Sequence, residues 1–147
     1  MTTFEADLHV ALADLTTARA ELVSAVQTLT PSDLERARRG GWPVHRVIEH
    51  AIEHDYMMAM VASAIRGTPA GPRGEMSCEG QAADEIICRM DSARTNLLSA
   101  VKDVSEDEFY RMLKLGHEEF SVLSVLENAA SHDREHAGQI RSILASD

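Results

Sequence analysis

The amino-acid sequence predicts an all-α fold, a four-helix bundle whose helices are joined by long connectors. Clusters of proline and glycine divide the chain of 147 residues into four long segments. Within each segment the apolar residues recur with the 3.6-residue period of a helix, and no stretch alternates as a β-strand does. Four helices that each have one apolar stripe bury these stripes by packing together. The length suits a single domain over residues 1–147, since most domains have about 100–150 residues.

We expect the four long helices at residues 4–29, 43–66, 81–101 and 121–145. Thr2 and Glu5 have the spacing of a capping box at the start of the first helix. Pro43 suits the first position of the second helix, because it lacks a backbone N–H and its φ angle is already helical. Gly67 suits the end of the same helix, where a left-handed residue commonly stops the chain.

Two shorter segments, at residues 31–38 and 105–114, are predicted to be single helical turns within connectors. Ser105 and Glu108 again have the spacing of a capping box. The connectors between the long helices are long enough to cross from one end of the bundle to the other. Helices that follow each other in the sequence therefore need not be antiparallel neighbours.

Composition restricts the classes of partner. The formal charge is −10 with histidine counted as neutral, so nucleic acids and anionic membrane surfaces would repel the protein. The longest apolar stretch, residues 57–65, is much shorter than the ~20 residues of a membrane span. The first residues lack the pattern of a signal peptide, and two cysteines are too few for a disulfide scaffold. We therefore expect a cytoplasmic protein with a small-molecule substrate and no nucleic-acid or membrane partner.

The positions of the histidines give the first indication of function. In the fourth helix, His132 and His136 lie on the apolar stripe, so that their rings are one turn apart on the buried face. In the second helix, His54 lies on the buried stripe and His50 stands one turn before it. The charged residues Asp133–Glu135 lie off the stripe of the fourth helix, and we expect them to be in solvent.

A metal site and a set of ordinary core histidines are the two interpretations of this pattern. A single buried histidine is most often hydrogen-bonded to a carbonyl or carboxylate group. Four of them are harder to satisfy in this way, because each ring has two nitrogen atoms and the neighbouring residues are mainly apolar. A pair of histidines at i and i+4 that faces another histidine across a bundle can bind a divalent metal. Its identity stays open among Zn, Ni and Fe, since imidazole binds all of them.

With these motifs the chain resembles the DinB/YfiT-like metalloenzymes, a family of four-helix bundles that hold a divalent metal between three histidines. The family has a tryptophan shortly before the second helix and a histidine eight residues later, which match Trp42 and His50. Near the C-terminus it has the pattern H-x-x-x-H-x-G-Q, which matches HDREHAGQ at residues 132–139. The resemblance covers essentially the whole chain.

The resemblance implies that the metal ligands are His50, His132 and His136. The role of His54 stays open between a fourth ligand, a proton carrier beside the metal and a hydrogen-bonded core residue. We favour an acid/base role or support of the ligands from outside the metal's coordination shell, because four histidine ligands would close the site to substrate.

Several other residues are candidates for supporting roles. Glu49, Glu53 and Gln139 are candidates to orient the N–H groups of the ligand rings, although each also fits a solvated surface position. Trp42 is expected to pack against the end of the bundle rather than on a ligand. Cys78 lies in a connector that we expect to be flexible, and we assign it no role.

Three neutral imidazoles leave positions on the ion for water or substrate, and a divalent ion acidifies a bound water or deprotonates a bound thiol. Relatives in the family include thiol-dependent S-transferases and isomerases that use bacillithiol or mycothiol. The resemblance therefore implies a metal-dependent enzyme that activates a low-molecular-weight thiol as cosubstrate, or a hydrolase that activates water. The alternative is a non-catalytic protein that binds a metal or small ligand in stress response. For both, the resemblance implies a homodimer.

Overall fold

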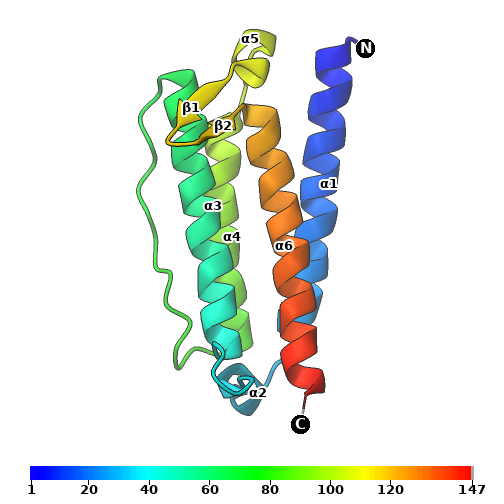
Figure 1. Ribbon diagram of the computed structural model, residues 1–147, viewed down its shortest axis with the longest axis vertical. Coiled ribbons are helices and arrows are strands. Elements are labelled where there is room, and N and C mark those ends of the chain that lie inside the picture. The colour runs from blue at the N-terminus through cyan, green and yellow to red at the C-terminus, as the bar shows by residue number, and fades with distance from the viewer. Residues whose placement is uncertain (147) are drawn as a thin grey trace.

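Four long helices and two short ones form the structure, a computed structural model that describes residues 1–146 (Figure 1). The long helices are α1 (Thr3–Val26), α3 (Val44–Arg66), α4 (Ala83–Val101) and α6 (Val122–Ala145). The helices α2 (Pro31–Glu35) and α5 (Glu106–Tyr110) have one turn each and lie in connectors. The predicted all-α bundle with long connectors is thereby confirmed.

Side-chain caps and one glycine set the ends of the helices. Thr2 accepts the backbone N–H of Glu5, and the Glu5 carboxylate accepts the N–H of Thr2, which completes the predicted capping box. A second predicted capping box begins at Ser105. Gly67 ends α3 with a φ angle of 70°, in the left-handed region that glycine adopts without strain. Pro43 precedes α3 as its N-cap rather than being its first helical residue.

The order of packing places the two histidine-bearing helices side by side. α1 packs against α6, α6 against α3, and α3 against α4, whereas the backbones of α1 and α4 approach each other at few points. In Figure 1, α1 and α6 run in one direction and α3 and α4 in the other, so α3 and α4 are parallel. The connector at residues 67–82 runs back along the outside of the bundle to make this possible. Within the described residues, no helix combines the length and the apolar character that a membrane span requires.

A small β-hairpin follows α5 and is absent from the prediction. β1 (Leu113–Leu115) pairs antiparallel with β2 (Glu118–Phe120), and the turn between them contains Gly116 at a φ angle of 64°. Strands of three mostly exposed residues lack the alternation over four to eight residues by which a strand is recognised. The helical turn predicted at 105–114 is therefore wrong beyond the end of α5. The turn predicted at 31–38 is likewise shorter in the structure.

The hydrophobic core consists of two clusters, one near α5 and the hairpin and the other near α2. Phe109 and Leu126 belong to the first cluster, and Ile48 and Ile140 to the second. Near the boundary between the clusters, each long helix contributes one buried charged residue: Arg19, Asp55, Arg94 and Asp133. The core thus has a charged layer close to its middle, at the level from which the candidate histidines project.

Candidate metal centre

Three histidines from α3 and α6 converge in the bundle. His50 comes from α3, and His132 and His136 come from successive turns of α6, which is the face that α6 presents to α3. One nitrogen atom of each ring lies within 4.8 Å of those of the other two rings. The ring centroid of His50 is 5.3 Å from that of His132 and 5.2 Å from that of His136. The structure therefore brings together the three residues that were predicted to be ligands.

Two nitrogen atoms in this group are buried without a hydrogen-bond partner among the described residues: Nδ1 of His132 and Nε2 of His136. The other nitrogen of His136, Nδ1, lies 3.0 Å from Oε1 of Gln139. An amide oxygen only accepts, so Nδ1 carries the proton and Nε2 keeps an unshared electron pair. A buried group left unpaired costs about 1–3 kcal/mol. The donor set therefore fits a divalent cation, which would bind such electron pairs.

The site is open on the side of His50. The His50 side chain is 35% exposed, and its Nδ1 atom lies 3.7 Å from Oε2 of Glu53. The Trp42 ring meets the His50 ring edge to face, with centroids 5.5 Å apart, and Trp42 remains 46% exposed. Trp42 lies just before the start of α3 and in addition contacts a candidate metal ligand. A small molecule that reached the site from this side would pass both rings.

His54 lies beside the three histidines but is not part of their close group of nitrogen atoms. Its ring stacks on that of His132, with centroids 3.7 Å apart and planes within 7° of parallel. Burial, together with the neighbouring imidazoles of His132 and His50, lowers the pKa of His54 to about 4. His54 is therefore an uncharged ring at neutral pH.

Burial also keeps the candidate ligands on α6 in the form that binds metals. Burial and the nearby rings of His136 and His50 lower the pKa of His132 below its ordinary value. Burial lowers the pKa of His136 as well, and the hydrogen bond with Gln139 offsets this only in part. Metal binding requires neutral imidazole, so no proton has to be removed from these rings at neutral pH.

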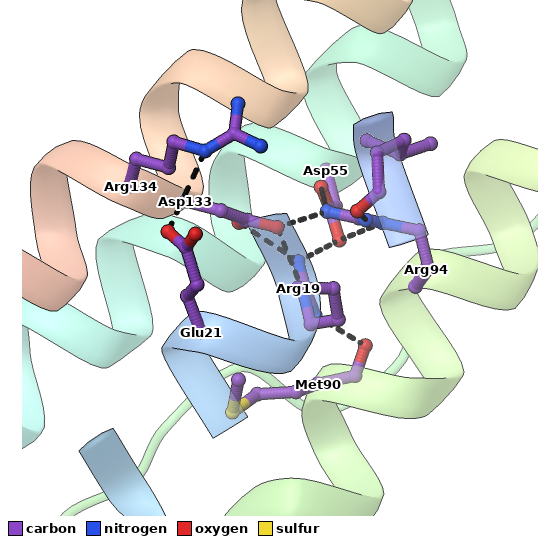
Figure 2. Close-up of polar contacts among 8 residues, drawn as sticks. Arg19, Glu21, Asp55, Met90, Arg94, Asp133 and Arg134 are labelled. Carbon is purple, nitrogen blue, oxygen red and sulfur yellow. Dashed lines mark hydrogen bonds and ion pairs between the residues drawn. The ribbon is translucent and has the colours of Figure 1, made fainter. Parts of the chain in front are cut away.

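A buried network of four charges lies next to the histidines and is shown in Figure 2. One member comes from each long helix, and each is at most 8% exposed. Arg19 donates to Asp55 at 2.7 Å and to Asp133 at 3.0 and 3.1 Å. Arg94 donates to Asp133 at 2.7 Å and to Asp55 at 3.1 and 3.2 Å. Two arginines and two aspartates thus form a neutral set in which every member is bonded.

The prediction that Asp133 lies in solvent is wrong. Its side chain is 2% exposed, because α1 and α4 deliver the two arginines that satisfy its oxygen atoms. Asp133 directly follows His132, and Asp55 directly follows His54. The charge network and the histidine group therefore share the same turns of α3 and α6.

The sequence does contain a signal for the charge network. Arg19 comes four residues after Leu15 and three before Leu22, both buried on the stripe of α1. Arg94 has the same relation to two buried residues of α4, Met90 and Leu97. An arginine at a stripe position in two helices predicts buried carboxylates elsewhere in the core, because a buried charge requires a partner.

Of the three residues proposed to orient the ligand rings, only Gln139 makes a hydrogen bond to one. Glu49 instead accepts the backbone N–H of Cys78 at 2.9 Å, on a different face of α3. This bond anchors the connector, and the Cys78 side chain packs in the second core cluster, where it is 1% exposed. The expectation of a flexible segment is therefore wrong at Cys78. Burial raises the pKa of Cys78 to about 12, and the nearby Glu49 adds to the rise, which keeps the thiol protonated.

A comparison with known protein families gives a match over most of the chain. The family model for the DinB superfamily matches residues 14–140. No curated protein and no solved structure matches the chain. The matched range includes both helix segments that carry the histidine group. Because the match covers most of the sequence, the chain belongs to the DinB superfamily.

Proposed function

We propose that the protein is a divalent-metal-dependent enzyme of the S-transferase type, which activates a low-molecular-weight thiol toward an electrophilic small molecule. The observation that carries this proposal is the convergence of three imidazoles, two of which have a buried nitrogen without a partner. Activation of water for hydrolysis uses the same residues and is the second form of the proposal.

His50, His132 and His136 would hold the ion, and Gln139 would fix the orientation of the His136 ring. A divalent ion held by three neutral imidazoles supplies a Lewis acid that favours the thiolate or hydroxide form of a bound thiol or water. The open side next to His50 and Trp42 supports access for a small molecule, and a three-ligand site keeps room for it. These features favour an enzyme over a closed structural site.

We assign His54 a positioning role. Its parallel stacking on His132 limits rotation of that ring, which would keep the ligand nitrogen aimed at the ion. A ring with a pKa of about 4 is also a weak base at neutral pH, which favours this role over that of a proton carrier.

The metal site is tested by paired alanine variants. We expect His132→Ala and His136→Ala each to abolish stoichiometric binding of Zn²⁺ or Ni²⁺, because two imidazoles cannot complete the site. Elemental analysis and calorimetric titration measure the binding, and circular dichroism should show unchanged helix content. His9→Ala, the same change at an exposed position of α1, is the matched control. Wild-type affinity in either site variant would refute the ligand assignment.

The activity is tested with the metal-loaded protein. We expect consumption of a low-molecular-weight thiol with an electrophile such as monochlorobimane, and loss of that turnover in His136→Ala. Metal bound at one equivalent per chain, with no turnover across several thiols or ester substrates, would instead support a non-catalytic metal-binding protein. A homodimer also stays a prediction, with which the exposed Met57 and Met60 on α3 are compatible.

A further inference from the structure

A cavity of about 150 Å³ adjoins the histidine group at the C-terminal end of α6. It is lined by Arg38, Gly41, Trp42, Gln139, Ser142 and Ile143. Two of these residues also touch the candidate ligands: Gln139 bonds with His136, and Trp42 packs against His50. The cavity is therefore next to the proposed metal site, on the side of Gln139 and Trp42.

The cavity wall offers hydrogen-bond donors and a positive charge. None of its lining residues is acidic, although the whole chain has a net charge of −10. Arg38 supplies a guanidinium group. The Oε1 atom of Gln139 is occupied by His136, so its NH₂ group is the part left to interact with a ligand. A group that only accepts hydrogen bonds and carries negative charge suits this wall.

Arg38 is held in place before any ligand arrives. One of its nitrogen atoms, Nη2, donates to the backbone carbonyl of Ser142 at 3.3 Å and also contacts the Ser142 hydroxyl. Its backbone carbonyl accepts the N–H of Gly41 at 2.8 Å, in a tight turn where Gly40 has a φ angle of 76°. Among the described residues, Nε and Nη1 of Arg38 have no partner. Each of these N–H groups can still donate to a carboxylate oxygen.

We infer that this cavity is a subsite for the carboxylate of a small substrate whose other end reaches the histidine group. This inference rests on the proposed function, because it describes one end of the same substrate. Gln139 and Ser142 are three and six residues after His136, which corresponds to roughly 5–9 Å along the helix axis. The substrate class is therefore a short carboxylic acid with its reacting thiol or electrophilic carbon a few bonds away. The volume fits only such a terminal group, since pockets for whole drug-sized ligands have about 300–1,000 Å³.

The first test uses metal-free protein, so that it does not depend on the metal site. Trp42 is the only tryptophan of the chain, and its emission reports directly on the cavity. We expect succinate to change this emission saturably, whereas the uncharged succinamide does not. Arg38→Gln should weaken the succinate response at least tenfold, and Arg38→Lys should restore part of it. Arg39→Gln removes the same charge from the same connector and should have little effect.

Two results would overturn the inference: equal responses to succinate and succinamide, or equal losses in Arg38→Gln and Arg39→Gln. Circular dichroism of each variant confirms that it is folded.

The second test uses protein loaded with Co²⁺, in which a bound thiolate gives a charge-transfer absorption band. We expect 3-mercaptopropionate to bind at least tenfold more tightly than 3-mercaptopropionamide, and Arg38→Gln to abolish this preference without weakening the amide. Equal affinities in the wild-type protein would overturn the inference and leave the metal site intact. Failure to bind Co²⁺, with a positive succinate test, would overturn the proposed function and retain the carboxylate subsite.

Discussion

The histidine group and the charge network occupy neighbouring positions on the same turns of α3 and α6, yet their hydrogen bonding differs. In the network, each aspartate accepts from both arginines, and the charges cancel. In the histidine group, two buried nitrogen atoms have no partner among the described residues. A buried polar set that satisfies itself holds helices together, whereas one that stays unsatisfied points to a ligand. By this difference the charge network is a structural site and the histidine group is a candidate binding site in the same core.

The largest expected effect comes from breaking the network on one side. Asp133→Ala leaves two buried arginines with one carboxylate, and we expect it to lower the free energy of unfolding by about 3–5 kcal/mol. Urea denaturation followed by circular dichroism measures the loss. The matched control is Asp14→Ala, which removes the exposed ion pair between Asp14 of α1 and Arg134 of α6 and should cost less than about 1 kcal/mol. Equal losses in the two variants would show that burial of the network contributes nothing.

A smaller loss of stability is expected when the pH is lowered. It arises in the histidine group and so distinguishes this group from the charge network. Because the pKa of His54 is about 4 in the folded protein and ordinarily 6.5, the unfolded chain binds more protons between these values. The stability of the metal-free protein should therefore be complete above pH 6.5 and fall as the pH drops toward 4. The contribution of His54 is on the order of 3 kcal/mol.

Urea midpoints from pH 7.5 to 4.5, compared between the wild-type protein and His54→Gln, isolate this contribution from that of the carboxylates. The glutamine variant should lose less stability on acidification. Parallel pH profiles for the two proteins would contradict the burial of an uncharged His54.

The smallest effect concerns support of the ligands. Gln139→Ala removes the group that orients His136, and we expect the affinity for Zn²⁺ to fall by about 10–100-fold with helix content unchanged. Competition with a chromophoric chelator measures the affinity. Gln139→Glu keeps an acceptor at this position and should restore most of the binding. An alanine variant with unchanged affinity would mean that the packing of α6 alone orients His136.

Much of this architecture could be predicted from the sequence, because helical spacing reports directly on which residues share a face. The 4-residue interval between His132 and His136 and their place on an apolar stripe predicted the cluster that the structure contains. The pattern also singled out His50 and His54 in the second predicted helix, and the resemblance selected His50 as the third ligand, more than eighty residues away in the sequence. Spacing within one helix gives no information on such distant partners.

The failures also have physical reasons. Asp133 lies one position, or about 100° around the helix, from the stripe residue His132. A side chain at that angle faces either solvent or a neighbouring helix, and here the arginines of α1 and α4 bind it in the core. Cys78 follows a run with proline and glycine, which predicts a loop but not the bond to Glu49 that buries it. The burial of both residues depends on contacts between elements that are distant in the sequence. The bond between Gln139 and His136 could be anticipated because it spans a single turn.

The order of the elements would also bear on when the proposed metal site is loaded during synthesis. A ribosome adds about 5–20 residues per second, so His50 emerges on the order of 10 s before His132 and His136. During that interval the nascent chain lacks α6, the second helix that bears proposed ligands, so the set of three stays incomplete. Loading should therefore follow translation, and a product truncated before α6 would carry only His50 of the three proposed ligands.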